Sequence, residues 1–216
     1  MGAEHSSMSV RDAIRGFYAI LDRDDEALAR ALVSEASVLQ VRLKPRGGRT
    51  DTADLIRVAR MARRICDEAG AALIVNDRID VALAADADGV HLGQTDVPIA
   101  AARQIAGDLW IGISTHNLEQ VREACAAGAD YLGFGPVFTT QTKERPDPVQ
   151  GVAALEAAVA AAPGRPIVAI GGITAANAAD LYRAGAAALC AISAVNDARD
   201  PRNIARQLRP GTLPSR

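Results

Sequence analysis

The sequence has few of the features that mark secreted or membrane proteins. Only 3 of its 216 residues are cysteines, and Cys66, Cys125 and Cys190 form no CxxC pair. An odd number of dispersed cysteines argues against a disulfide framework or a zinc site, so we expect reduced thiols in a cytoplasmic protein. The chain also lacks an apolar run of membrane-spanning length and a charged-then-apolar leader.

An excess of one charge is also missing. The 24 Lys and Arg residues are offset by 26 Asp and Glu, and the basic residues form no stripe. This balance argues against nucleic acid as a partner. No membrane partner is expected either, and the oligomeric state is left open.

What the chain does contain is a repeated pattern. Eight short apolar runs, nearly all rich in β-branched residues, are each followed by an Ala-rich amphipathic segment. Apolar runs without alternation are typical of parallel strands buried on both faces, and eight strand–helix units can close into a (β/α)8 barrel. The runs are Phe17–Leu21, Val38–Lys44, Ala71–Asp77, Gly89–Leu92, Trp110–His116, Tyr131–Phe138, Pro166–Gly172 and Ala188–Val195.

The fold class is thus α/β, a single-domain (β/α)8 barrel over residues 10–209. A flexible segment, 1–9, and a tail, 210–216, flank it. Helix boundaries fit this layout, because capping residues precede and glycines follow three amphipathic segments. These are Asp51 or Thr52 to Ala69 with Gly70, Asn117 to Ala127 with Gly128, and Thr174 to Ala184 with Gly185. The sequence Ala-Gly-Ala-Asp at 127–130, which has looser echoes elsewhere, predicts a helix end followed at once by a strand.

In such a barrel the active site lies at the carboxyl ends of the strands. Two long polar loops, 44–51 and 139–148, follow strand ends and are expected on that face. Gln40, Arg42 and Lys44 alternate along the second predicted strand, so all three point to one side. They form a donor cluster for an anionic substrate or, alternatively, an ordinary solvated strand end.

Carboxylates follow the next two strands. Asn76 and Asp77 end the third, and Asp96 lies just beyond the fourth. Because consecutive barrel strands are neighbours, Asp77 and Asp96 can converge on a Mg²⁺ ion. Each could instead cap the helix that follows it, Asp96 with Pro98 in the first turn. The two roles do not exclude each other.

Ser114 to His116 end the fifth strand. We expect Ser114 to point inward, while His116 is either a general base or a solvated flank, and His91 is a hydrogen-bonded residue of the barrel. The loop after the sixth strand carries Thr139, Thr140, Thr142 and Lys143, a set suited to phosphate. Gly171 and Gly172 after the seventh strand and Ser193 after the eighth lie where phosphate sites of these barrels form, and a tight turn alone does not explain Gly172.

Taken together, these motifs resemble the thiamine-phosphate synthase (thiamine-phosphate pyrophosphorylase) family of (β/α)8 barrels. The resemblance runs in order over about Phe17 to Val195. It rests on QVRLK (40–44), LIVNDRIDVALAADADGVHLGQTD (73–96), IGISTH (111–116), ADYLGFGPVFTTQTK (129–143), PVQG (148–151), VAIGGI (168–173) and AIS (191–193).

The resemblance implies a transferase of thiamine biosynthesis. It would condense 4-amino-2-methyl-5-(diphosphooxymethyl)pyrimidine with a thiazole phosphate, giving thiamine phosphate and pyrophosphate. It assigns Asp77 and Asp96 to Mg²⁺. Contacts to the pyrimidine diphosphate would come from Gln40, Val41, Arg42, Leu43, Lys44, Asn76, Ser114 and Lys143, and contacts to the thiazole phosphate from Thr140, Gln141, Thr142, Gly171, Ile192 and Ser193. The catalytic set would be Arg42, Lys44, Ser114 and Lys143, with no protein nucleophile.

Two residues depart from the family pattern. Leu43 stands where an acid is common, and Thr139 where proline is common. Leu43 is expected to point away from Arg42 and Lys44, and Thr139 to alter the stiffness of its loop.

Other functions on this barrel are a thiazole tautomerase, a non-catalytic phospho-ligand sensor and a sugar-phosphate isomerase or epimerase. The first two do not need the carboxylate pair. The third needs a base, for which His116 is the candidate.

Overall fold

The computed structural model describes residues 8–43, 51–140 and 148–212 and confirms the predicted barrel. Over these residues eight parallel strands close in chain order, because β1 pairs with both β2 and β8. The carboxyl ends of all strands therefore lie on one rim. The strands are β1 (Gly16–Leu21), β2 (Ala36–Val41), β3 (Ala72–Asn76), β4 (Gly89–Leu92), β5 (Trp110–Thr115), β6 (Tyr131–Phe134), β7 (Ile167–Ile170) and β8 (Ala188–Cys190).

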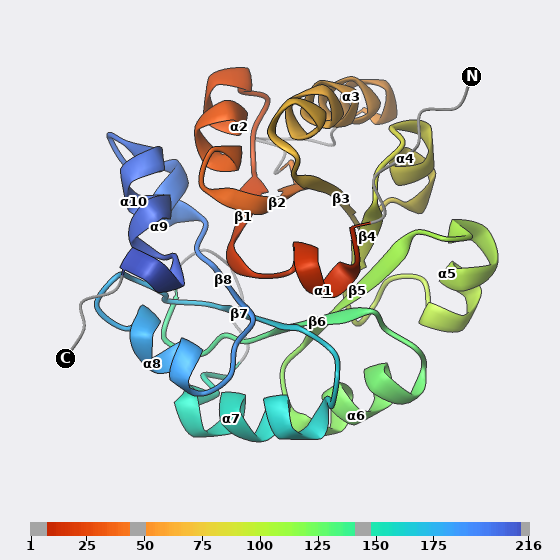
Figure 1. Ribbon diagram of the computed structural model, residues 1–216. Coiled ribbons are helices and arrows are strands. Elements are labelled where there is room, and N and C mark those ends of the chain that lie inside the picture. Colours follow the sequence, from red (N-terminus) through yellow and green to blue (C-terminus); the bar gives the residue numbers. More distant parts are fainter. Residues whose placement is uncertain (1–7, 44–50, 141–147, 213–216) are drawn as a thin grey trace.

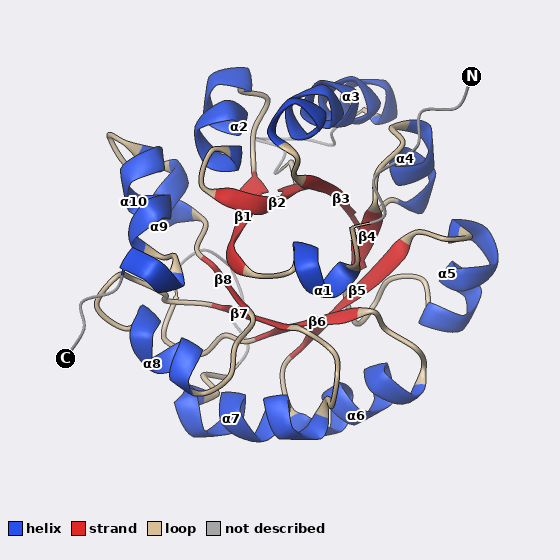
Figure 2. Ribbon diagram, viewed as in Figure 1, coloured by secondary structure: helices blue, strands red, loops and turns tan. Residues whose placement is uncertain are grey.

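Helices form a ring outside the strands (Figure 2). They are α2 (Glu26–Val33), α3 (Thr52–Ala69), α4 (Ile79–Ala84), α5 (Ile99–Ala106), α6 (Leu118–Ala126), α7 (Gly151–Ala161), α8 (Ala178–Arg183), α9 (Ser193–Asn196) and α10 (Pro201–Gln207), with a 3₁₀ turn η1 (Pro210–Thr212) inside the predicted tail. None of the helices in the described ranges is long and apolar enough to cross a membrane.

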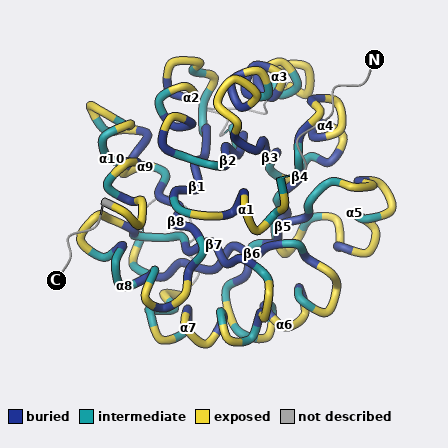
Figure 3. Tube along the Cα trace, in the orientation of Figure 1, coloured by how far each residue is buried: buried dark blue, intermediate teal, exposed yellow. Residues whose placement is uncertain are grey.

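Side chains that alternate along each strand separate into two apolar clusters. Along β2, Leu39 and Val41 pack outward with the helices, while Val38 packs inside the barrel. Figure 3 shows the result: the strands are buried, and exposure is confined to the outer faces of the helices and to loops. This alternation decides which strand residues can reach a site inside the barrel.

A short helix, α1 (Val10–Ala13), lies across the amino-terminal mouth of the barrel, in the middle of the strand ring in Figure 1. Ala13 and Ile14 are buried in the interior cluster, and Met8 packs against it. The hydroxyl of Ser9, a residue predicted to be flexible, accepts the Asp12 N–H at 3.2 Å and caps this helix. The interior is therefore closed at one end and accessible from the carboxyl-terminal rim.

The repeated Asp before a strand has a specific structural role. Asp88 Oδ2, before β4, accepts the Leu73 N–H of β3 at 2.7 Å and pairs with Arg63 at 2.7 Å. Asp130 Oδ2, before β6, accepts the Ile111 N–H of β5 at 2.7 Å and pairs with Arg103. The Ala-Gly-Ala-Asp echo therefore also supplies an acceptor for the first N–H groups of the preceding strand.

Several predicted boundaries need correction. Helix α3 begins at Thr52, but the side chain of Asp51 before it makes no capping hydrogen bond. Helix α6 begins at Leu118 as predicted, and the Asn117 side chain accepts the Gln120 N–H. Thr174 does not cap α8: the helix begins at Ala178, because residues 174–177 form a turn in which Asn177 Oδ1 accepts the Thr174 N–H at 2.8 Å. Most predicted strand runs extend past the observed strands because the residues that follow each strand form the site loops.

Glu35, which lies just before β2 at the amino-terminal rim, links this rim to the segment around α10. Its carboxylate, 6% exposed, accepts hydrogen bonds from Arg202 at 3.2 Å and Arg209 at 2.9 Å. Burial alone would raise its pKa, but the two guanidinium groups outweigh burial and lower the pKa below its usual value of 4.5.

We predict that Glu35→Gln lowers the free energy of unfolding by about 1–2 kcal/mol at pH 7, since two charge-assisted hydrogen bonds to half-exposed arginines are weakened. Because the folded-state pKa is lowered, the difference from wild type should be complete above about pH 4.5 and shrink as pH falls further. Urea unfolding at several pH values measures it. Glu26→Gln, which removes an exposed ion pair to Arg30, is the control and should change stability by less than about 0.5 kcal/mol. Equal effects of the two substitutions at pH 7 would contradict the account.

Candidate active site

A cavity of about 250 Å³ opens at the carboxyl-terminal rim, inside the ring of strands. Each of the eight strands supplies at least one residue to its wall, and the loops after β2, β5, β6, β7 and β8 supply others. This is the position predicted for the active site of a (β/α)8 barrel.

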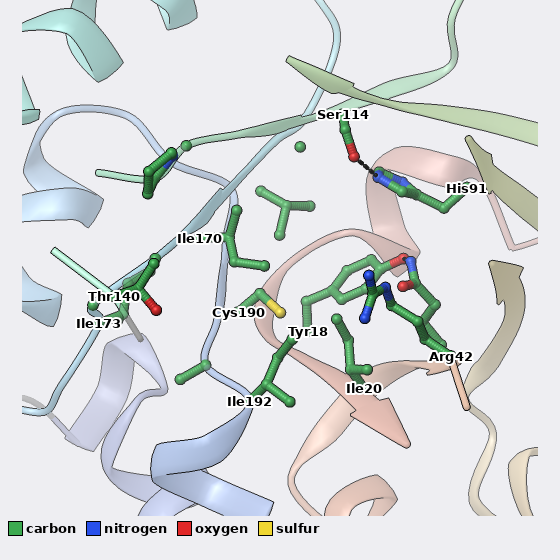
Figure 4. Close-up of a pocket in the computed structure, with 18 of the residues that line it drawn as sticks. Tyr18, Ile20, Arg42, His91, Ser114, Thr140, Ile170, Ile173, Cys190 and Ile192 are labelled. Carbon is green, nitrogen blue, oxygen red and sulfur yellow. Dashed lines mark hydrogen bonds between the residues drawn. The ribbon is translucent and has the colours of Figure 1, made fainter. Parts of the chain in front are cut away.

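The cavity has two polar sides with an apolar floor between them. In Figure 4, Arg42, His91 and Ser114 lie on one side, and Thr140 lies on the other beside Ile173. Ile20, Ile170, Cys190 and Ile192 lie between the two sides. Burial raises the pKa of the Cys190 thiol to about 12, so this residue is a neutral apolar surface at pH 7.

The second strand behaves as its alternation predicts. Gln40 and Arg42 line the cavity, whereas the side chains of Val41 and Leu43 pack in the outer layer against the helices. Val41 and Leu43 can therefore contact a ligand only through their backbone. Lys44 lies outside the described residues, so its placement stays a prediction.

The two acidic residues meet at the rim next to Arg42. Burial, together with the charge of Asp96 and a hydrogen bond to its carboxyl group, raises the pKa of Asp77 to about 6. Arg42 and Asn76 act in the opposite direction. Asp77 also has a left-handed backbone, with φ of 61°, which the N–H bond from Asp77 to the His91 carbonyl at 2.8 Å holds in place. Carboxyl groups from β3 and β4 therefore do converge.

Neither carboxylate caps a helix. Arg78 directly precedes α4 and Pro98 directly precedes α5, and neither side chain makes a capping hydrogen bond to its helix. Asp96 Oδ2 instead accepts the Gly93 N–H at 2.6 Å, which closes the turn after β4. Within residues 8–43, 51–140 and 148–212 no group of three or more His, Cys, Asp and Glu side chains gathers, so a cation here would need water or substrate oxygens in addition to the pair.

Ser114 points inward as expected, and its Oγ lies 2.9 Å from His91 Nε2. His91 is hydrogen-bonded on both ring nitrogens, which fits its prediction as a residue of the barrel. Burial and the charge of Arg42 lower the pKa of His91 to about 4, so the imidazole is neutral at pH 7. His116 also lines the cavity, with Nδ1 donating to the Gly135 carbonyl at 2.6 Å. His116 is therefore not a solvated flanking residue. Because Nδ1 carries the hydrogen of this bond, Nδ1 cannot act as a base.

Two tyrosines of the site were not predicted from the sequence. Tyr18 and Tyr131 are buried inside the barrel with their hydroxyl groups 2.9 Å apart, and they join Gln40 to His91. The sequence feature that could have indicated them is the glycine at position 112 in β5. A Cβ there would lie 2.1 Å from the Tyr131 ring, so this position must carry no side chain.

Thr140, Gly171, Ile192 and Ser193 all line the cavity, with Thr140 on the side opposite Arg42 and Ile192 between the two sides. Gln141, Thr142 and Lys143 lie outside the described residues, so their part in this side stays a prediction. Thr139 is exposed and does not line the cavity.

Packing between two loops, rather than a tight turn alone, accounts for Gly171 and Gly172. Gly171 and Gly172 have φ of 100° and 64°. A Cβ on Gly171 would lie 2.5 Å from Pro136 Cβ, and one on Gly172 would lie 2.5 Å from the Thr139 carbonyl oxygen. Both glycines are required because the loops after β6 and β7 pack against each other. Phosphate binding is not needed to explain them.

Fold and cavity together define the class of protein: a (β/α)8 barrel with a small-molecule site, half cationic and half hydroxyl-bearing, at the carboxyl ends of its strands. Comparison with known proteins narrows this class. A family model described as thiamine monophosphate synthase matches residues 17–195.

Relatives in several organisms agree. The thiamine-phosphate synthase of Chloroflexus aurantiacus is 48% identical over 83% of this chain and 81% of its own. That of Pyrococcus furiosus is 39% identical over 94% of this chain and 96% of its own. The solved structure of thiamine phosphate pyrophosphorylase from Pyrococcus furiosus superimposes with a TM-score of 0.83 at 35% identity, covering 93% and 96% of the two chains. The chain belongs to the thiamine monophosphate synthase family, and the protein is an enzyme of the transferase class.

The glycine pair yields a prediction about the loop contact. Gly172→Ala should destabilise the protein by about 1–3 kcal/mol more than Gly70→Ala. Both positions have nearly the same φ, 64° and 67°, but a Cβ at Gly70 would meet nothing within 4 Å. Chemical denaturation of the two variants measures the difference. Equal losses would mean that backbone strain alone, and not the contact with Thr139, makes glycine necessary.

Proposed function

We propose that the protein condenses 4-amino-2-methyl-5-(diphosphooxymethyl)pyrimidine with a thiazole phosphate to give thiamine phosphate and pyrophosphate. The observation that carries this assignment is the meeting of Asp77 and Asp96 beside Arg42, which lies on the opposite side of one cavity from Thr140. A reaction between a diphosphate ester and a monophosphate needs two separate anion sites, and the apolar floor between them suits two aromatic rings. We propose the cytoplasm as its location, in keeping with three free cysteines.

The donor set fits Mg²⁺. The charge of Asp96 and a hydrogen bond to its carboxyl group make ionisation of Asp77 more costly, and a divalent cation bound by the two groups would remove that cost. We propose that Asp77 and Asp96 hold Mg²⁺. Bound there, the ion would supply positive charge to the diphosphate group of the substrate.

The side chains near this pair would stabilise the leaving group. The bond between the pyrimidine methylene carbon and the diphosphate oxygen breaks with its electron pair on the oxygen, and the lone pair of the thiazole nitrogen forms the new carbon–nitrogen bond. Arg42, with Lys44 and Lys143 as predicted partners, would neutralise the charge that grows on pyrophosphate. Asn76 and Ser114 would position the same substrate. No protein nucleophile takes part.

The other side of the cavity would hold the thiazole phosphate. Thr140 and Ser193 offer hydroxyl groups there, and the glycines at 171 and 172 bring the backbone close to the ligand, with Ile192 beside them. Gln141 and Thr142 are proposed to complete the contact. Rigid packing of the loops after β6 and β7 would keep this side fixed while the diphosphate side binds and releases.

The direct test supplies both substrates. With Mg²⁺ present, equal amounts of pyrophosphate and thiamine phosphate should form, and excess EDTA should stop the reaction because the carboxylate pair loses its cation. Coupled pyrophosphate detection and chromatography of the product measure the two amounts. Turnover of the thiazole phosphate alone, without pyrophosphate release, would replace this proposal by an isomerase.

The role of the carboxylate pair can be tested separately. Asp77→Asn should lower kcat at least about 100-fold, since one charge of the cation site is lost. Asn tolerates the left-handed backbone at this position, so the fold should be kept. Asp86→Asn is the matched control, because Asp86 has a similar φ of 52° and lies at the opposite rim, before β4. Near-normal turnover of Asp77→Asn in Mg²⁺ would contradict the assignment.

A further inference from the structure

Five polar side chains form one continuous chain of hydrogen bonds along the inner wall of the cavity. Gln40 Nε2 lies 2.9 Å from the Tyr18 hydroxyl, which lies 2.9 Å from the Tyr131 hydroxyl. From there the chain continues over 3.1 Å to His91 Nδ1, and over 2.9 Å from His91 Nε2 to Ser114 Oγ. Gln40, Tyr18 and Tyr131 are buried, and all five residues line the cavity.

We call these five hydrogen-bonded side chains the relay. The strands leave space for it. Gly112 on β5 is paired with Tyr131 on β6 and with His91 on β4, and a Cβ at Gly112 would overlap the tyrosine ring. A Cβ at Gly133 would lie 3.2 Å from His91 Cε1. Two strand positions thus carry no side chain where the rings of the relay pass, which makes the relay a feature of the barrel rather than a chance contact.

The amide at one end of the relay fixes the direction of the first bond. The Gln40 Nε2 group can only donate, so the Tyr18 oxygen accepts from it. Geometry alone allows either hydroxyl group to donate in the next bond. In the arrangement in which each group donates to the next one, the Tyr18 hydrogen goes to the Tyr131 oxygen and the Tyr131 hydrogen goes to His91 Nδ1. With Nδ1 accepting, a neutral imidazole carries its hydrogen on Nε2 and donates it to Ser114 Oγ.

We propose that the relay runs in this direction and thereby makes Ser114 a hydrogen-bond donor to the ligand, with Tyr131 and His91 acting as positioning residues. Ser114 Oγ accepts from His91, so its own hydrogen is directed into the cavity. The Gln40 side-chain oxygen stays an acceptor at the other end of the relay.

The consequence for substrate choice rests on the proposed function. A ligand on this side of the cavity must offer a lone pair to Ser114 and a hydrogen to Gln40, which a ring nitrogen and an exocyclic amine can do. A ligand with the opposite pattern would leave a buried group unpaired, which is a strong basis for discrimination.

Nitrogen-15 NMR of the histidine side chains tests the direction without any substrate. The chain has three histidines, and the loss of one signal set in His91→Gln assigns that residue. We expect His91 at pH 7.5 with hydrogen on Nε2 and none on Nδ1. Hydrogen on Nδ1, a mixture of tautomers, or a doubly protonated ring would overturn the proposal.

Gln40→Glu should reverse the relay, because a carboxylate accepts from Tyr18 and each later bond then changes direction. The expected result at pH 8 is His91 with hydrogen on Nδ1, and thermal unfolding checks that the variant is folded. Gln94→Glu places an equal charge near the carbonyl of Ser114, outside the relay, and should leave the tautomer unchanged. An unchanged tautomer in Gln40→Glu would show that Gln40 does not set the direction.

Kinetics test the positioning role. Tyr131→Phe and Ser114→Ala should each lower kcat/KM for the pyrimidine diphosphate by about tenfold. The double variant should lose no more than Ser114→Ala alone, because Tyr131 acts through Ser114. Losses that multiply would mean that Tyr131 only supports the fold. If no condensation occurs at all, the proposed function fails while the NMR result still decides the direction of the relay.

Discussion

Closure of the sheet by the pairing of β1 with β8 is the constraint on which the site depends. Each strand is at most six residues long, so inside and outside are decided by the alternation of a few side chains. Closure also brings the loops that follow all strands to one rim. A residue just past β2 can therefore face residues from β7 and β8 across a single cavity.

The same constraint explains why two carboxylates lie together in the fold although 19 positions separate them in sequence. Asp77 follows β3 and Asp96 follows β4, and these strands are hydrogen-bonded neighbours. Partial desolvation of its carboxyl group, together with the charge of Asp96, raises the pKa of Asp77. Below the rim, burial lowers the pKa of His91, so its imidazole is neutral at pH 7. Charge is thus confined to the rim, where a diphosphate would enter.

Much of this arrangement follows from the sequence. The strand runs, the inward direction of Gln40, Arg42 and Ser114, and the convergence of Asp77 with Asp96 could all be predicted, because each depends on local alternation and on which strands are neighbours. The tyrosines could not, since Tyr131 in an apolar strand reads as ordinary core and its partner Tyr18 is 113 residues away.

Contacts between loops could not be predicted from the sequence either. The need for Gly171 and Gly172 comes from the loop after β6, and the turn that delays α8 comes from the Asn177 side chain rather than from Thr174. Such features depend on how segments distant in sequence pack. Lys44 and Lys143, which the sequence places with the diphosphate, lie outside the described residues and stay predictions.

The most direct measurement of the central claim is the position of the cation. Crystals grown with Mn²⁺ and the pyrimidine diphosphate should show one anomalous peak between the carboxyl groups of Asp77 and Asp96, in contact with diphosphate oxygens. A peak bound to other residues, or a diphosphate seated on the side of Thr140 and Ser193, would contradict the account.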